Sequence, residues 1–232
     1  MSGPANLYIN LDRLMRRISD LAKVGAIEGG GVSRLALKEE DRRGRNPVVS
    51  LMGHLGMEVS IDQIGNVLGV REGTELGPSV LTGSHIDTVR TSGRYDGSLG
   101  VFAGLEAVAT LNEVGMRPRH PLAVRFFTNE EGARFTPNRM GSMVHQGHLE
   151  LDEMLDTCGV DGTTVCEYLE NISYAGQVPC GSVKARSYVE LHIEQGPVID
   201  TRAITCGAVE GVQGISWTEV NITGLANHAG TC

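Results

Sequence analysis

Histidines and carboxylates recur in five short motifs along this 232-residue sequence, and their types suit metal-assisted chemistry. In order, the motifs are SHID at 84–87, YDG at 95–97, NEEG at 129–132, LHIEQGP at 191–197 and NHAG at 227–230. Imidazole nitrogens together with carboxylate oxygens are ligands that zinc, manganese, cobalt and nickel accept in proteins. The motifs therefore indicate a metal site, whereas no G-x-S-x-G motif indicates a serine nucleophile.

The first motif directly follows an apolar stretch at residues 79–84 that is typical of a strand. Residues two apart on an extended segment face the same side, so the Asp87 carboxylate can orient the imidazole of a metal-bound His85. Open α/β sheets bind ligands at the carboxyl ends of their strands, which favours this position. A histidine in a polar loop is the plain alternative for the motif taken alone.

Carboxylates dominate the second and third motifs. Asp96 precedes a helix rich in small residues, where its two oxygens could bridge two metal ions, although an Asp–Gly pair is also a common turn. Glu130 and Glu131 end a second apolar strand at residues 122–128. One of these two could bind a metal while the other moves protons during hydrolysis, and a solvated acidic turn is the alternative.

The last two motifs each offer one histidine. His192 and Glu194 alternate with Leu191 and Ile193, so a strand would place the two polar side chains on one face. By itself, His192 is more typical of a hydrogen-bonded core residue than of a metal ligand. His228 stands between small residues, as many turn histidines do.

Apolar periodicity predicts an α/β fold around these motifs. We expect helices at residues 7–21, 47–54, 100–114, 147–155 and 165–169. Strands are expected at residues 57–62, 66–70, 79–84, 122–128, 188–194 and 215–222. The order of strand, helix and strand predicts a crossover connection and a largely parallel sheet. A change of domain is expected near residues 211–214.

Composition excludes several classes of protein. Asp and Glu outnumber Lys and Arg by 28 to 20, giving a net charge of −8, so neither a nucleic-acid partner nor a polybasic membrane anchor is expected. No apolar run is long enough to cross a membrane, and no signal peptide is visible. The 5 cysteines form no C-x-x-C pair and predict free thiols in a reducing, cytoplasmic environment.

Taken together, the motifs resemble the amidase/hydantoinase/carbamoylase branch of the M20 metallopeptidase-like family. The matching segments are TGSHIDTVRTSGRYDGSLGV, FTNEEGARF, LHIEQGP, EGVQGISW and GLANHAG, which span residues 82–230. The resemblance implies a di-metal aminopeptidase-like catalytic domain over residues 1–211, with a mixed, largely parallel sheet flanked by helices. It also implies that residues 212–232 begin a smaller α+β lid or dimerisation domain.

The same resemblance implies two divalent metal ions, either zinc, manganese, cobalt or nickel, and a role for each motif. His85 matches a ligand of one ion, Asp96 matches the carboxylate that bridges both, and Glu131 matches a ligand of the second. His192 matches a further ligand that is typical of this branch. Glu130 matches the general base.

Two further residues match parts of a substrate site. Gln195 matches a substrate-contacting amide, and His228 matches a lid histidine that reaches the active site of a partner subunit, which implies a homodimer. The implied reaction is hydrolysis of the carbamoyl (ureido) C–N bond of N-carbamoyl-L-amino acids, small-molecule substrates, by a metal-bridged water with Glu130 as base.

Two alternatives remain open at this point: an allantoate amidohydrolase, and an inactive fragment that binds only metal or a partner chain. Members of the branch are longer and end with a further metal-binding histidine and a substrate-binding asparagine and arginine. None of these is found here, so we expect this chain to be truncated.

Overall fold

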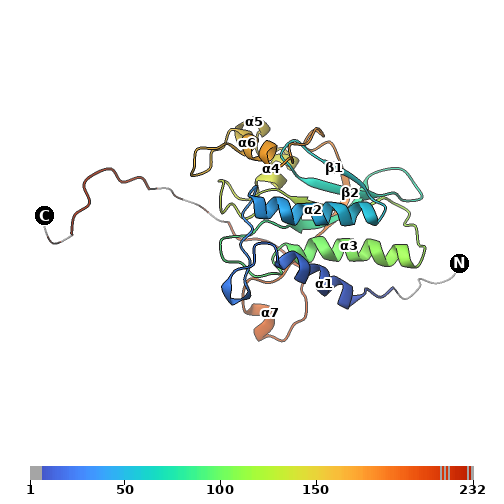
Figure 1. The fold of residues 1–232 in the computed structure, drawn as a ribbon. Helices are drawn as coiled ribbons and strands as arrows, with labels where there is room; N and C mark the ends of the chain where they lie inside the picture. Colours follow the sequence, from blue (N-terminus) through green and yellow to red (C-terminus); the bar gives the residue numbers. More distant parts are fainter. Residues whose placement is uncertain (1–6, 215, 217, 219, 229, 231–232) are drawn as a thin grey trace. The chain divides into compact units, whose positions relative to one another are not determined.

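The computed structural model describes residues 7–214, 216, 218, 220–228 and 230. The chain divides into two units, Met1–Ile193 and Glu194–Cys232. Regular structure belongs almost entirely to the first unit (Figure 1), and the described part of the second holds only the short helix α7 (Val198–Thr201). No helix among the described residues is long and apolar enough to cross a membrane, and the described cysteines are unpaired.

A five-stranded sheet forms the centre of the first unit, in the order β1-β2-β4-β3-β5. Its strands are β1 (Glu58–Ile61), β2 (Val67–Arg71), β3 (Ser79–His85), β4 (Leu122–Phe127) and β5 (Ala185–Val189). β2 pairs antiparallel with β1 and β4, while β3 pairs parallel with β4 and β5. Among the described strands β2 alone therefore runs against the others, which confirms the predicted α/β class with a mixed, largely parallel sheet.

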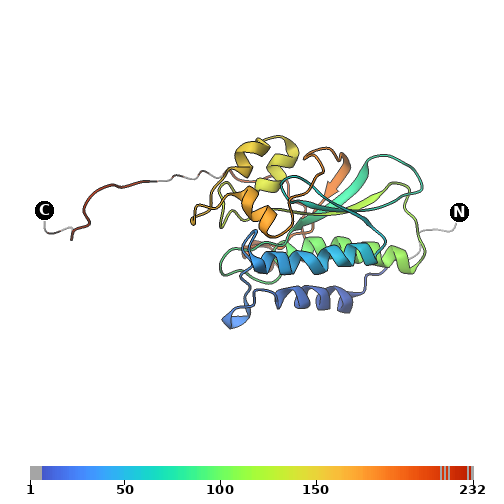
Figure 2. The same ribbon diagram turned by 45° about the horizontal axis from the view of Figure 1, so that its top comes forward.

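Helices cover one face of this sheet, as Figure 2 shows. They are α1 (Leu11–Ala22), α2 (Glu39–His54) and α3 (Ser98–Glu113), with the short 3₁₀ turn η1 (Glu28–Gly30) between α1 and α2. α2 packs on β1 and β2, α3 packs on β3 and β4, and α1 packs on α3. A Cβ at Gly104 would lie 2.7 Å from Thr82 Cγ2, so the small residues of α3 allow its close approach to the sheet.

Three short helices follow β4 and extend the core beyond the end of that strand. They are α4 (Met140–Gln146), α5 (Leu151–Leu155) and α6 (Val165–Asn171). Their buried side chains, among them Met140, Val144, Met154 and Leu169, join the same hydrophobic core as α2 and α3. This cluster therefore supports the loop that directly follows β4.

Two helix predictions differ from the structure. The expected helix at 47–54 begins at Glu39 instead, and Pro47 lies inside it. Apolar periodicity did not predict the first half of this helix, because a helix is recognised by apolar residues on its inner face. Here Asp41 and Arg45 occupy the inner face as a fully buried ion pair, with Arg45 Nε 2.8 Å from Asp41 Oδ2. The helical structure expected around 147–155 begins only at Leu151, because Gly147 ends the preceding helix α4 with a φ of 74°.

Two strand predictions also differ. The strand expected at 188–194 is β5 at Ala185–Val189, so the segment after residue 189 leaves the ladder before His192. In the strand expected at 215–222, residues 216, 218 and 220–222 form no strand, and residues 215, 217 and 219 lie outside the described residues. The predicted domain boundary between residues 211 and 212 stays a prediction.

Candidate metal centre

Three predicted ligands meet at the carboxyl ends of β3 and β5. His85 is the last residue of β3, Asp96 lies in the turn before α3, and His192 follows β5 by three residues. Asp96 Oδ1 lies 3.7 Å from His85 Nε2 and 3.4 Å from His192 Nε2. The two imidazole rings are stacked with centroids 6.1 Å apart. One ligand atom from each of the three residues therefore lies within 4.8 Å of the other two.

Hydrogen bonds on the far side of each ring fix the direction of both lone pairs. His85 Nδ1 is 2.9 Å from the main-chain oxygen of Asp87, and His192 Nδ1 is 2.9 Å from the main-chain oxygen of Ile193. A carbonyl oxygen can only accept, so Nδ1 must carry the proton in each ring. In the neutral tautomer, each Nε2 then presents its lone pair toward the Asp96 carboxylate.

This arrangement fits a divalent cation. A lone pair facing a carboxylate oxygen at 3.4–3.7 Å is repulsive, and it becomes favourable only when a proton or a cation lies between them. Nitrogen and oxygen ligands bound at about 2.0–2.2 Å in a tetrahedral site would stand about 3.4 Å apart, close to the separations seen. The donor set of two imidazoles and one carboxylate suits zinc, manganese, cobalt or nickel.

A main-chain turn at Gly97 is required for this convergence. Gly97 has a φ of 60°, and a Cβ there would lie 2.5 Å from both Nε2 and Cδ2 of His85. Only glycine satisfies the backbone conformation and leaves room for the ring. The Asp–Gly pair is therefore a turn, as the plain alternative held, and also part of the wall of the site.

Asp87 joins the histidine to the acidic loop after β4. Its buried carboxylate accepts the main-chain N–H groups of Glu130 and Glu131, each over 3.3 Å. The same carboxylate is 3.9 Å from His85 Nδ1, too far for a hydrogen bond, so the main-chain oxygen of Asp87 orients the imidazole instead. Burial raises the pKa of Asp87 to about 6, and the nearby imidazole of His85 opposes that shift.

The side chains of the glutamate pair both stand beside the cluster. Glu130 Oε2 is 3.7 Å from His85 Nε2, and its Oε1 is 3.6 Å from Arg139 Nε. Glu131 Oε1 is buried without a hydrogen-bond partner, although a second ion would supply one. Burial raises the pKa of Glu131 to about 7 against the opposing effect of His85, with nearby carboxylates adding to the rise.

An excess of negative charge surrounds His85. Burial alone would lower the pKa of its imidazole, but the carboxylates of Asp87, Glu130 and Glu131 outweigh burial and raise it. A proton on Nε2 and a metal cation at the same point would neutralise the same charges. The electrostatics therefore agree with the geometry in favouring a positive charge here.

The remaining predicted site residues, Gln195 and His228, belong to the second unit, Glu194–Cys232. Both are exposed there, and the main-chain N–H of Gly230 donates to His228 Nδ1 over 3.1 Å. Their proposed roles in substrate binding stay predictions.

Several supporting residues escaped sequence reasoning. Arg139 contacts Glu130. The buried Arg34 donates from Nε to the main-chain oxygen of Ile86 over 2.7 Å. The Asn66 carboxamide oxygen accepts a hydrogen bond from the main-chain N–H of Thr128 over 2.9 Å. Each of them contacts a residue more than 8 positions away in sequence, beyond the reach of motifs and periodicity. Of these three residues, Asn66 has a local sequence signal, because Asp62 and Asn66 around Gly65 are typical of a turn.

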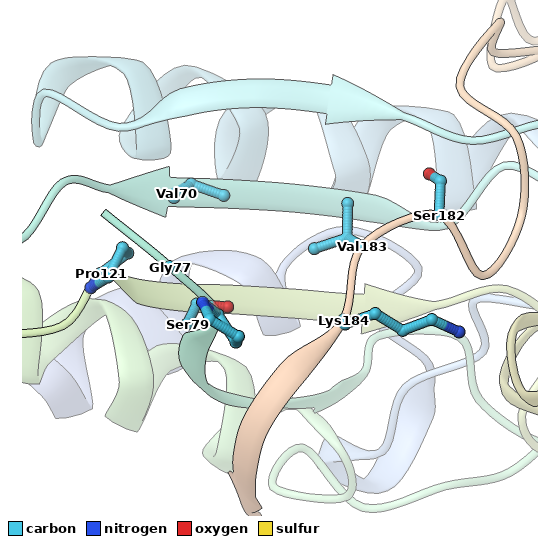
Figure 3. A pocket seen from close by; sticks show the side chains of 8 residues that line it. Val70, Gly77, Ser79, Pro121, Ser182, Val183 and Lys184 are labelled. Atoms are coloured by element: carbon cyan, nitrogen blue, oxygen red, sulfur yellow. The ribbon is translucent and has the colours of Figure 1, made fainter. Parts of the chain in front are cut away.

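A hollow beside the sheet lies elsewhere. It has a volume of about 330 Å³ and opens on the face opposite α2 and α3, beside Val70 of β2 and the start of β3 (Figure 3). Ser182, Val183 and Lys184 line its other side, and none of the metal-centre residues contributes to it.

Comparisons with known proteins agree on one family. The sequence profile of peptidase family M20/M25/M40 matches residues 81–229, well over half of the chain. An N-carbamoyl-L-amino acid amidohydrolase of Geobacillus stearothermophilus is 41% identical over 227 residues, covering 94% of this chain and 54% of that protein. A ureidoglycolate hydrolase of Arabidopsis thaliana is 33% identical over 237 residues, covering 97% of this chain and 50% of that protein.

Solved structures give the same picture. The crystal structure of a hydantoinase/carbamoylase family amidase from Burkholderia ambifaria matches with a TM-score of 0.83 and 42% identity. The match covers 85% of this chain and 49% of that one. The chain therefore spans about half the length of the relatives that it matches.

Proposed function

The chain belongs to peptidase family M20/M25/M40, and from this premise we propose that it carries the metal-binding part of a hydrolase acting on the carbamoyl C–N bond of N-carbamoyl-L-amino acids. One observation carries the proposal: the Nε2 lone pairs of His85 and His192 both face the Asp96 carboxylate. Without a positive charge among them this arrangement is repulsive, so its natural occupant is a cation.

His85, Asp96 and His192 would hold the first divalent ion, and Asp96 with Glu131 would offer ligands to a second. Bound there, the ions supply a water of near-neutral pKa and polarise the carbonyl of the substrate. Zinc, manganese, cobalt and nickel all suit these ligands. The buried Oε1 of Glu131, which has no hydrogen-bond partner, supports the proposal of a second ion.

Glu130 is the base in this proposal. Its carboxylate is partly exposed, so a substrate can reach it, and Arg139 lies beside Oε1 and thereby leaves Oε2 directed at the cluster. Oε2 takes a proton from water as the oxygen attacks the ureido carbon. The same carboxyl then returns the proton to the amino nitrogen as the C–N bond breaks and the free amino acid leaves. The other product, carbamate, breaks down to carbon dioxide and the ammonia that an assay can detect.

Relatives named as N-carbamoyl-L-amino-acid amidohydrolases reach 41% identity, whereas those named ureidoglycolate hydrolase reach 33%. This difference favours a carbamoyl amino acid as substrate. Because both groups of names denote ureido compounds, ureidoglycolate and allantoate are the second choice. Residues 1–211 as catalytic domain, a homodimer and a cytoplasmic location complete the proposal.

Ammonia release from N-carbamoyl-L-methionine, ureidoglycolate and allantoate, measured with added Mn²⁺ or Zn²⁺, tests the activity. We expect release from the carbamoyl amino acid and a loss of about 10²–10⁴-fold in Glu130→Gln with metal content unchanged. Activity of that variant within tenfold of wild type would remove Glu130 from the role of base. Bound metal without release from any substrate would favour the alternative of an inactive metal-binding fragment.

A further inference from the structure

The two histidines of the centre are joined across a gap in the sheet. β3 and β5 pair in parallel from Ser79 opposite Ala185 to Thr82 opposite Val189, and the ladder ends there. His85 stands three residues beyond the last rung on one side, and His192 stands three residues beyond it on the other. Main-chain hydrogen bonds between β3 and β5 therefore do not set the distance between the two imidazoles.

Side chains occupy this gap instead. Glu190 is the first residue after β5, and its carboxylate accepts a short hydrogen bond from the hydroxyl of Ser84, the neighbour of His85. The hydroxyl of Tyr188 lies 2.9 Å from the other oxygen of Glu190 and 3.2 Å from the main-chain oxygen of Gly83. These contacts connect the two strand ends just before each histidine.

Burial indicates which contact matters most. Ser84 is buried, with only 2% of its surface exposed, so its hydroxyl needs a partner within the protein, and Glu190 supplies it. A carboxylate accepts at both oxygens and so can hold the Ser84 and Tyr188 hydroxyls at once. The residue that follows, Leu191, places its main-chain oxygen 2.7 Å from the position of a Cβ on Gly100, so α3 closes the other side of the segment.

We propose that Glu190 is a positioning residue for the metal centre: held by Ser84 and Tyr188, it replaces the missing rungs between β3 and β5 and sets the place of His192. The inference rests on the proposed metal site and deepens it. Glu190 is not itself a ligand, since the converging group consists of His85, Asp96 and His192.

Titration of the 232-residue chain with Co²⁺, followed by visible absorption, tests this role. We expect Glu190→Ala to weaken Co²⁺ binding about tenfold and to change the absorption bands of the bound ion, because outer contacts of metal ligands have effects of this size. Glu190→Gln should restore part of the affinity, since its amide oxygen still accepts from Ser84. Tyr188→Phe should cause a smaller loss.

Tyr168→Phe is the matched control, because Tyr168 also donates to a carboxylate, that of Asp161, and neither residue belongs to the group of His85, Asp96 and His192. It should leave both affinity and spectrum unchanged. Hydrogen exchange of the amides at 190–193 gives a second readout that needs no metal. Exchange there should accelerate in Glu190→Ala and Tyr188→Phe and stay unchanged in Tyr168→Phe.

The outcomes separate the two proposals. If His192→Ala abolishes Co²⁺ binding while Glu190→Ala keeps the wild-type affinity, spectrum and exchange, the positioning role is wrong and the metal site stands. If the wild type binds no Co²⁺, or binds it equally well without His192, the metal site is wrong. Exchange at 190–193 then decides the bridging role alone, and an unchanged rate in Glu190→Ala overturns it.

Discussion

His85 and His192 bring the same imidazole to one point by different means. His85 is the last residue of β3, and it still pairs with Phe127 of the neighbouring strand β4. Only 2% of this residue is exposed. His192 follows the outermost described strand, beyond its last rung, and 36% of its side chain is exposed. The main chain of a central strand places the first ring, whereas a few side-chain contacts place the second.

This difference predicts that substitutions near His85 and substitutions near His192 have different effects on stability and on cation affinity. Changes that remove or displace the buried His85 ring should affect both the stability of the fold and the affinity for a cation, because the same buried contacts serve both. Changes on the β5 side should affect affinity alone, because little of the core depends on that segment. Three predictions test the contrast, beginning with the largest expected effect, and a fourth concerns a histidine outside the centre.

Removal of either imidazole should weaken cation binding by more than the roughly 10–100-fold that loss of an outer contact causes. His85→Ala should also lower the free energy of unfolding by about 1–3 kcal/mol, because the buried main-chain oxygen of Asp87 loses its donor. His192→Ala should stay within about 0.5 kcal/mol of wild type. Urea unfolding beside Co²⁺ titration measures both, and equal destabilisation by the two variants would contradict the contrast.

Gly97→Ala should follow in size. A Cβ at this position would lie 2.5 Å from the His85 ring and from the main-chain oxygen of His85, and the φ of 60° adds strain. Gly115→Ala is a close control, because Gly115 has a φ of 63° with nothing within 4 Å of its Cβ position. Both variants should lose about 1–2 kcal/mol from backbone strain. Only Gly97→Ala should lose more unfolding free energy than this, and only this variant should lose affinity for the cation. Equal losses of stability in the two variants would show that Gly97 does not form part of the wall of the site.

Asp87→Asn separates the side chain of this residue from its main chain. The carboxylate accepts the N–H groups of Glu130 and Glu131, and an amide oxygen can serve only one of them fully. We therefore expect a loss of about 1–3 kcal/mol in unfolding free energy. Affinity for Co²⁺ should remain near that of wild type, because the main-chain oxygen holds His85. A loss of affinity as large as that of His85→Ala would show that the carboxylate orients the ring after all.

The smallest effect concerns pH and a histidine outside the centre. Burial lowers the pKa of His145 to about 4, and the nearby charges of Arg125 and Lys184 contribute. Between its ordinary pKa of about 6.5 and pH 4, the unfolded chain binds a proton that the folded chain does not. The contribution of His145 to stability should therefore fall as pH falls through this window, whereas the raised pKa values of Asp87 and Glu131 act in the opposite direction.

Urea unfolding at pH 7, 6, 5 and 4.5 measures this slope. His145→Gln should flatten it without changing the affinity for Co²⁺ at pH 7, and His54→Gln on the exposed side of α2 is the control. An unchanged slope in His145→Gln would show that burial of the neutral His145 ring is not the cause of the acid sensitivity.

The contrast between the two histidines also shows which parts of the site can be predicted from the sequence. Apolar strands that end in SHID and NEEG predict the positions of His85 and of the glutamate pair, because strand ends of a parallel sheet gather at one edge. The segment LHIEQGP alternates like a strand, yet it lies beyond the ladder that ends at Val189. Alternation therefore could not place His192, and the bridge through Glu190 depends on hydroxyls distant in sequence, such as that of Ser84.

The buried ion pair of α2 gives the same lesson for the fold. Periodicity expects apolar residues on the inner face of a helix, and Asp41 with Arg45 satisfies that face through a hydrogen-bonded charge pair instead. Such pairs are specified by their partners across the fold, here the main-chain oxygen of Gly65 and the hydroxyl of Thr128, rather than by local pattern.

Anomalous diffraction at the zinc edge, recorded from crystals of the 232-residue chain soaked with Zn²⁺, shows directly whether a cation binds between the two imidazoles and Asp96. We expect a strong peak bonded to His85 Nε2, His192 Nε2 and an oxygen of Asp96. A map without a peak among these three atoms, or with zinc held only by other residues, would contradict this expectation.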